Sequence, residues 1–169
     1  MILYPDAMAD SVDDIPWKDL YDRGYRGVIF DIDNTLVPHG APADEHAIEF
    51  FKMLRETGFD TCLISNNKEK RVTPFAENVG SKAVWKANKP SRKNYLYACK
   101  LMKTTAQNTL FVGDQLFTDV WGANRAGIKS ILVSPIDKKE EIQIVLKRYL
   151  ERPIMYFYNR KKDRADKLF

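Results

Sequence analysis

Short apolar segments of strand length alternate with helix-forming segments along most of this 169-residue chain. The apolar segments are rich in Val, Ile and Leu without clean alternation of apolar and polar residues, which is typical of strands covered on both faces. Two parallel strands need a crossover connection, usually a helix. The pattern therefore predicts an α/β fold in which helices cover both faces of a parallel sheet, a three-layer α/β sandwich. We expect the strands at residues 27–31, 61–65, 82–87, 109–113 and 130–134.

The segments between the strands carry apolar residues at helical spacing. In the segment 91–103, Leu96, Cys99 and Met102 are spaced to face the core together. Pro74 must lie in the first turn of its helix or kink it, because proline lacks the backbone N–H. We expect the helices at residues 13–25, 44–58, 71–80, 91–103, 118–127 and 138–151.

The length suits one domain that buries a substantial core. We expect a single domain over residues 1–169, with its core at 25–135 and a basic, aromatic C-terminal extension at 136–169. No apolar run approaches the roughly 20 residues that a membrane span needs, and the N-terminus is acidic, unlike a secretory signal. The expected location is the cytoplasm, where Cys62 and Cys99 are expected to be buried, reduced thiols. The sequence leaves the oligomeric state open.

The C-terminal region supplies the positive charge of the chain. Residues 138–169 hold ten Lys and Arg against five Asp and Glu, and aromatic residues at 156–158 stand beside the last basic cluster. This composition suits peripheral contact with an anionic surface such as the inner face of the membrane. It also suits RNA, although we favour the membrane over nucleic acid. A third interpretation is a strand or loop that packs its aromatic residues on the core and exposes its charged end.

Polar side chains cluster where the predicted strands end. In an open parallel sheet, ligands bind beyond the carboxyl ends of the strands. Residues far apart in the sequence are therefore expected to converge on one rim of the sheet. The candidates are Asp31, Asp33, Asn34, Thr35, Ser65, Asn66, Asn67, Lys89, Asp114 and Asp119.

The carboxylates of this set suggest a metal ion. Carboxylates placed close together repel one another, and burying them is costly. Asp31, Asp114 and Asp119 are hard oxygen donors that suit Mg²⁺, and a shared cation offsets the repulsion and attracts an anionic substrate. Lys89 adds a positive charge and Ser65 adds a hydroxyl donor. Together these are the parts needed to hold a phosphoryl group.

The order of these motifs resembles the haloacid dehalogenase (HAD) superfamily of phosphohydrolases. The motif "DIDNTL" at 31–36, Ser65 after a strand, Lys89 before a proline and "GDQLFTD" at 113–119 stand in the order of the four motifs of that family. The resemblance runs over residues 25–135. The longer stretches "DIDNTLVPHGAP", "LISNN" and "GDQLFTDVWGANRAG" are similar to the subclass IIIA, YqeG-type branch, which is itself similar to phosphatidylglycerophosphate phosphatases. The resemblance implies a Rossmann-like parallel sheet.

The resemblance also implies a role for each matching residue. Asp31 would be the nucleophile that forms an aspartyl-phosphate, and Asp33 would use a free carboxyl to protonate the leaving group and then activate water. Ser65 would hydrogen-bond the phosphoryl group, and Lys89 would balance its charge. The Mg²⁺ ligands would be Asp31, Asp33 through its backbone carbonyl, and Asp114, and Asp119 would bind the ion through water or orient Lys89. The supporting substrate-binding residues would be Asn34, Thr35, Asn66 and Asn67.

HAD enzymes often insert a cap domain after the first motif or between the second and third motifs. Neither interval has room for one here, since Ser65 and Lys89 are 24 positions apart and one helix and one strand fill the interval. The resemblance therefore implies a capless phosphatase with an open site. An open site gains little from enclosing a small metabolite, so the best candidate is a phosphate on something large, such as the phospholipid phosphatidylglycerophosphate. The alternatives are a sugar phosphate, nucleotide or phosphoprotein substrate, and a HAD-shaped RNA- or ribosome-binding module with dispensable catalysis.

Overall fold

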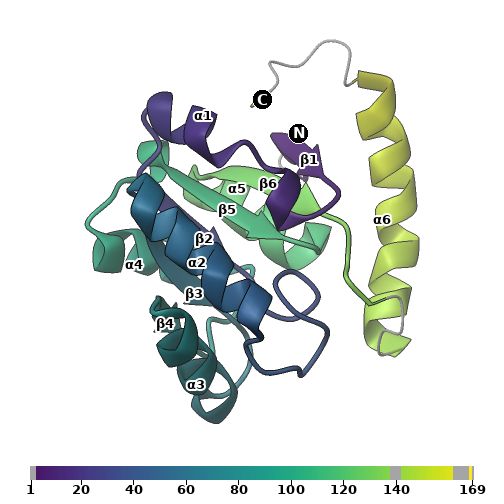
Figure 1. Cartoon of the computed structure of the whole chain (residues 1–169). Coiled ribbons are helices and arrows are strands. Elements are labelled where there is room, and N and C mark those ends of the chain that lie inside the picture. The colour runs from purple at the N-terminus through teal and green to yellow at the C-terminus, as the bar shows by residue number, and fades with distance from the viewer. Residues whose placement is uncertain (1–2, 138–141, 162–167, 169) are drawn as a thin grey trace.

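The computed structural model describes residues 3–137, 142–161 and 168, and these residues contain one sheet of six strands (Figure 1). The order across the sheet is β1-β6-β5-β2-β3-β4, and every neighbouring pair is parallel. All five strands expected from the sequence are present. The strands are β1 Ala7–Ala9, β2 Gly27–Phe30, β3 Asp60–Ile64, β4 Lys82–Val84, β5 Thr109–Gly113 and β6 Lys129–Val133.

Helices make the crossover connections between the strands. The α-helices are α1 Trp17–Asp22, α2 Glu45–Thr57, α3 Glu69–Val79, α4 Arg92–Met102, α5 Trp121–Ala126 and α6 Ile142–Lys161. Three short turns complete the described secondary structure: the 3-10 turns η1 Val12–Asp14 and η2 Ala106–Asn108, and the π-helical turn η3 Leu116–Val120.

Two helical layers enclose the sheet (Figure 1). Helices α1, α2 and α3 pack on one face, and α4 and α5 pack on the other. Neighbouring residues of β2 serve the two faces, since Val28 and Phe30 belong to the first core and Ile29 to the second. All three side chains are fully buried, which explains why this strand is a continuous apolar run. The predicted three-layer sandwich is confirmed.

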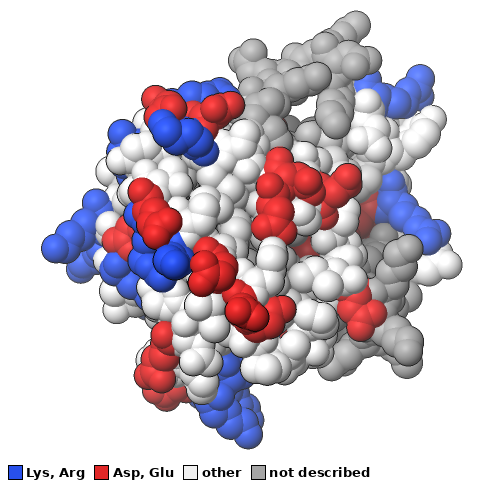
Figure 2. Space-filling view, in the orientation of Figure 1, with Lys and Arg blue, Asp and Glu red and all other residues white. Residues whose placement is uncertain are grey.

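The edge strand β1 was not predicted. Its three residues, Ala7–Ala9, are too few to show a pattern. Contacts with β6 hold it in place: the Asp6 backbone N–H donates to Ser130 O at 2.9 Å, and the Asp6 carboxylate lies 2.6 Å from Lys129 Nζ. Figure 2 shows further acidic side chains gathered over this N-terminal part of the chain. The first strand is therefore specified by partners more than a hundred positions away.

Helix α4 buries a different stripe from the one expected. Cys99 and Met102 are buried as predicted, but Leu96 is 40% exposed. Tyr95 is fully buried instead, and its hydroxyl donates to Thr118 O at 2.6 Å. A buried tyrosine needs a partner for its hydroxyl, and here that partner comes from a segment distant in the sequence.

Helix α3 begins two residues earlier than expected, at Glu69. Pro74 is therefore its sixth residue and lies beyond the first turn, where proline removes an intrahelical hydrogen bond. A proline inside a helix costs roughly 3 kcal/mol of helix stability. The helix continues to Val79 because Val72 and Phe75, among others, are buried against the sheet.

The C-terminal helix is also longer than expected. We expected the helix to end at residue 151, and one interpretation of the aromatic segment after it was a strand or loop. Instead, α6 continues through that segment to Lys161. Residues 138–141 and 162–167 of the extension lie outside the described residues. Helix α6 runs along the side of the molecule near the β1 and β6 edge (Figure 1). Ile154 and Met155 anchor it on a small apolar cluster that includes η3 and β6.

No described helix is long and apolar enough to cross a bilayer.

The sheet order reverses at its centre, between β2 and β5. Strands β3 and β4 extend the sheet on one side, and β5 and β6 extend it on the other. Such a reversal leaves a crevice beyond the carboxyl ends of the two central strands. One loop joins β2 to α2, and only α3 and β4 stand between β3 and the loop that contains Lys89. No cap domain covers the crevice within the described residues.

Candidate active site

Asp31 and Lys89 form a buried ion pair at this crevice. Asp31 directly follows β2, and its backbone N–H donates to Val112 O at 3.0 Å. Lys89 reaches it from the loop after β4, with Nζ 2.6 Å from Asp31 Oδ1. The same ammonium lies 2.8 Å from Asp119 Oδ1. The side chains of Asp31 and Lys89 are only 8% and 5% exposed, so both charges are removed from bulk water.

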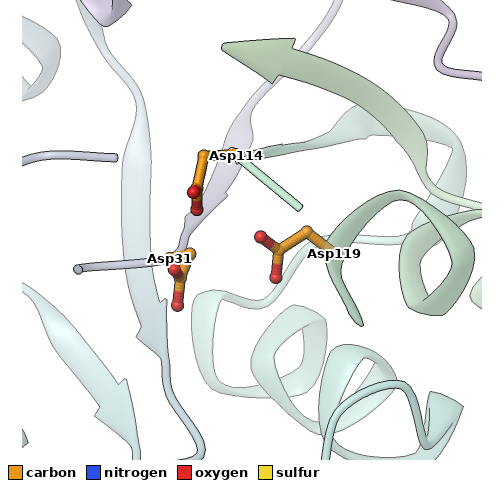
Figure 3. A group of neighbouring side chains, drawn as sticks. All are labelled: Asp31, Asp114 and Asp119. Carbon is orange, nitrogen blue, oxygen red and sulfur yellow. The ribbon is translucent and has the colours of Figure 1, made fainter. Parts of the chain in front are cut away.

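The carboxylates of Asp31, Asp114 and Asp119 turn toward one another at this point (Figure 3). One oxygen from each lies within 4.8 Å of the other two, and all three residues are buried. Thr35 Oγ1 donates to Asp114 Oδ1 at 3.3 Å and helps to hold that carboxylate. Buried carboxylates at this spacing are the hard oxygen ligands that Mg²⁺ takes in proteins. The donor set therefore fits a divalent cation.

Burial raises the pKa of Asp31 from 3.8 to about 7, because the charged form is poorly solvated. Lys89 opposes this rise and Asp119 adds to it. Burial would lower the pKa of Lys89, but the carboxylates of Asp119 and Asp31 outweigh it and raise that pKa. The cluster therefore joins a permanent ammonium to a carboxyl group that exchanges its proton near neutral pH.

Asp119 enters the cluster because Gly113 has no side chain. A Cβ atom on Gly113 would stand 2.5 Å from Asp119 Oδ2, so even alanine would displace the carboxylate. Asp119 lies on the π-helical turn η3, a rare conformation that is frequent at functional sites. Its Oδ2 also accepts the Gln115 backbone N–H at 3.1 Å. The glycine that ends β5 is thus a packing requirement of the site.

The carboxyl group of Asp33 accepts three hydrogen bonds. Its Oδ1 accepts hydrogen bonds from Gly40 N at 2.8 Å and from Arg71 Nη2 at 2.9 Å. Its Oδ2 accepts a hydrogen bond from Asn67 Nδ2 at 2.8 Å. Three segments therefore orient the carboxyl group to which the family resemblance assigns proton transfer.

Arg71 is the residue of the site to which the sequence did not point. It lies in the first turn of α3, and its guanidinium stands over the Phe75 ring at 5.6 Å. Its Nε atom is buried and has no hydrogen-bond partner among the described residues. An arginine in the first turn of a helix is usually a solvent-exposed surface residue. Its pairing with Asp33, 38 positions earlier, carries no sequence signal that we can name.

The loop after β3 places the predicted residues Ser65, Asn66 and Asn67. Ser65 is buried, and its Oγ accepts the Asn67 backbone N–H at 3.1 Å. Asn66 holds the backbone of Lys89, with its Oδ1 2.6 Å from Lys89 N. The Asn67 side chain turns to Asp33. Both amides thus contact other residues of the site.

Asn34 and Thr35 are buried in the loop after Asp31. Asn34 has a φ of 64°, a left-handed conformation that asparagine tolerates better than most residues. Its Oδ1 accepts the Asp137 backbone N–H at 3.3 Å, which ties the loop to the segment after β6. Thr35 points to Asp114. In this structure the Asn34 side chain holds the loop in place, and the Thr35 side chain holds a carboxylate of the acidic cluster.

Comparison with known proteins identifies the class to which this fold and site belong. The family model of the haloacid dehalogenase-like hydrolases matches residues 40–127. The probable phosphatase YqeG of Bacillus subtilis is 36% identical over 158 residues, which cover 93% of this chain and 92% of that protein. The chain therefore belongs to the haloacid dehalogenase-like hydrolase family, and it is a phosphoric monoester hydrolase of that family.

Two further proteins extend the comparison. Phosphatidylglycerophosphate phosphatase 1, chloroplastic/mitochondrial, of Arabidopsis thaliana is 28% identical over 160 residues, and the match covers 87% of this chain but 45% of that protein. An uncharacterized protein from Listeria monocytogenes serotype 4b has a crystal structure that matches with a TM-score of 0.54 and 18% identity. That match covers 80% of this chain and 99% of the other, and it supports the fold alone.

Proposed function

We propose that this protein is a Mg²⁺-dependent phosphomonoester hydrolase that works through an aspartyl-phosphate on Asp31. The observation that carries the proposal is the buried Asp31 carboxylate, 2.6 Å from the Lys89 ammonium and close to the carboxylates of Asp114 and Asp119. A nucleophile at the end of a central strand, next to a fixed cation, suits an anionic phosphate ester. The position of Asp31 in the motif "DIDNTL" supports the same role.

The reaction has two steps, formation of the aspartyl-phosphate and its hydrolysis. First, an Asp31 carboxylate oxygen attacks the phosphorus, the bond to the leaving oxygen breaks, and that oxygen takes a proton from Asp33. Next, water attacks the phosphorus of the aspartyl-phosphate and gives its proton to Asp33, which releases inorganic phosphate and restores Asp31. Lys89 balances the charge of the transferring oxygens, and the Ser65 hydroxyl donates a hydrogen bond to them.

Asp31, Asp114 and Asp119 would hold Mg²⁺, and the backbone carbonyl of Asp33 would be a further ligand. When bound, the ion supplies positive charge that stabilises the ionised carboxylates and the phosphate oxygens. The three buried carboxylates within 4.8 Å of one another support this assignment.

Arg71 would act as a positioning residue for Asp33. We expect Arg71→Met, which keeps the aliphatic stem, to lower kcat for an alkyl phosphate by about tenfold to a hundredfold, because general acid catalysis contributes roughly 10²-fold or more. An aryl phosphate has a leaving group that needs little protonation, so its kcat should fall much less. Arg71→Lys should recover part of the loss, and Arg26→Met, a change at an exposed residue just before β2 and away from α3, is the control. Equal losses on alkyl and aryl phosphates would contradict this role.

The best candidate substrate is phosphatidylglycerophosphate at a membrane surface. One relative at 28% identity carries the name of a phosphatase for that lipid. The crevice lies open within the described residues, which suits a phosphate presented by a large body. Both observations support a lipid substrate.

The outer face of α6 supports peripheral contact with the membrane. Arg152 lies over the Tyr149 ring at 4.5 Å, and Arg160 lies over the Tyr156 ring at 5.7 Å. Aromatic rings beside basic groups suit the interface of an anionic bilayer. Four large side chains of this face are between 55% and 60% exposed: Tyr149, Leu150, Tyr156 and Phe157.

Phosphate release from phosphatidylglycerophosphate in mixed micelles tests the substrate and the surface together. We expect the wild type to hydrolyse this lipid faster than any soluble sugar phosphate, nucleotide or phosphopeptide. The double variant Tyr156→Ser, Phe157→Ser should lose activity several-fold on micelles and keep its rate on a soluble aryl phosphate. Cleavage of the aryl phosphate without cleavage of the lipid would remove the lipid assignment and leave a soluble phosphate or phosphoprotein as the substrate.

A further inference from the structure

A pocket of about 540 Å³ opens between the start of α3 and the loop after β4. Its volume lies in the range of pockets that hold small molecules. None of the residues to which the proposed mechanism assigns a role lines it. The lining includes Lys68, Glu69, Lys70, Thr73, Trp85 and Lys86.

The pocket is cationic. It brings together Lys68, Lys70 and Lys86 against the single carboxylate of Glu69. None of the three ammonium groups forms an ion pair with another described residue. Lysines that share one hollow without partner carboxylates repel each other and attract an anion of high charge density.

The pocket also has an apolar wall. Trp85 lines the pocket and is 40% exposed. Pro74 adds a second apolar side chain to the lining. A cationic rim around an apolar wall fits an organic phosphate, whose charged group binds the lysines and whose carbon backbone covers the ring.

The pocket adjoins the part of the site where the leaving group is expected. The Lys86 backbone N–H donates to Asn67 O at 2.9 Å, and the Asn67 side chain donates to Asp33. Arg71, the neighbour of Lys70 in α3, binds Asp33 as well. The two segments that carry the lysines thus also hold the residue proposed to protonate the leaving oxygen.

We propose that this pocket binds a second phosphate group, carried by the leaving group of the substrate. The inference rests on the proposed function and narrows its substrate class to phosphomonoesters whose leaving group bears a further phosphate mono- or diester. A phospholipid head group and a water-soluble bisphosphate share this chemistry, and the experiment distinguishes them.

The test compares two soluble substrates that differ in the second phosphate. One is glycerophosphoglycerophosphate, the deacylated head group of phosphatidylglycerophosphate, and the other is glycerol 3-phosphate. The triple variant Lys68→Gln, Lys70→Gln, Lys86→Gln should lose about tenfold or more in kcat/KM for the first, mostly through KM, and less than about twofold for the second. The loss should shrink as salt is added, since the lysines are exposed.

The matched control removes the same number of positive charges elsewhere. The variant Lys52→Gln, Lys100→Gln, Lys103→Gln should leave both substrates within about twofold of the wild type. Equal losses on the two substrates in the pocket variant, or no loss on either, would overturn the inference. A loss on micellar phosphatidylglycerophosphate that matches the loss on its deacylated head group assigns the pocket to the lipid, whereas a loss on the soluble compound alone assigns it to a soluble bisphosphate.

A binding measurement separates this inference from the proposed function. Calorimetric titration of the Asp31→Asn protein with glycerophosphoglycerophosphate reports binding without turnover. We expect the three pocket substitutions to raise Kd about tenfold in this background. If the pocket substitutions weaken binding but the wild type does not hydrolyse the compound, only the proposed function is overturned. If the wild type hydrolyses the compound but the pocket substitutions leave binding unchanged, only the pocket assignment is overturned.

Discussion

Asp31→Asn is expected to lower kcat for a phosphomonoester by a factor on the order of 10³ or more. The substitution keeps the size of the side chain but removes the carboxylate that would form the covalent intermediate. Phosphate release from an aryl phosphate measures the effect directly. The loss should be in kcat, because Lys89 and the other donors of the site would still bind the phosphate group.

Asp60→Asn is the matched control for this change. Asp60 also pairs with a lysine, with its Oδ2 2.7 Å from Lys82 Nζ, but it begins β3 at the opposite end of the sheet from the crevice. We expect this control to keep its rate within about twofold, as surface ion pairs contribute little. Comparable rates for Asp31→Asn and the wild type would refute Asp31 as the nucleophile.

Magnesium ions should raise the melting temperature of the protein, and by more at pH 8 than at pH 6. Burial raises the pKa of Asp31 to about 7, so at pH 6 a proton occupies the carboxyl group that the ion needs. At a concentration about a hundred times Kd, Mg²⁺ should add about 2.7 kcal/mol of stability. For a chain of this size that corresponds to roughly 5–10 °C in Tm.

The direction in which the stability of the metal-free protein changes with pH follows from the same pKa. The pKa of Asp31 in the fold, about 7, lies above its ordinary value of 3.8, so this group favours the folded state fully below the lower value. That contribution is lost as the pH rises through 7. Metal-free protein should therefore lose stability between pH 6 and pH 8, and Mg²⁺ should restore it. Differential scanning fluorimetry checks both trends, and a Mg²⁺ response that persists in Asp114→Asn would argue against the assigned site.

The central strands could be predicted from the sequence because both faces of each are covered. Buried residues such as Phe30 and Phe111 make these strands continuous apolar segments, which can be recognised without knowing which strands pair. The edge strand β1 left no such run, since its pairing depends on contacts of Asp6 with β6. Helix α6 was underestimated for a local reason: Pro153 lies inside it, and proline usually ends a helical pattern. In α4, Tyr95 replaced Leu96 in the core because its hydroxyl found a distant acceptor.

The convergence of the acidic residues could be predicted because parallel strands share one carboxyl edge. Asp31 and Asp114 follow neighbouring strands, β2 and β5, so the topology brings them together. The orientation of the supporting side chains could not be predicted in this way. The pair of Arg71 with Asp33 depends on where α3 packs, and the turn of Asn66 toward Lys89 depends on the loop after β4. Such contacts join loops whose relative positions no local pattern encodes.

Direct detection of the phosphorylated enzyme is the measurement that tests the mechanism most closely. An aryl phosphate is mixed with Mg²⁺ and the Asp33→Asn variant, in which hydrolysis of the intermediate should be slow, and acid quench is followed by mass spectrometry of the peptides. We expect one phosphoryl group on the peptide that contains Asp31, absent from the double variant Asp31→Asn, Asp33→Asn. Wild-type turnover with no phosphoryl group on that peptide at any quench time, in either the wild type or Asp33→Asn, would contradict the mechanism.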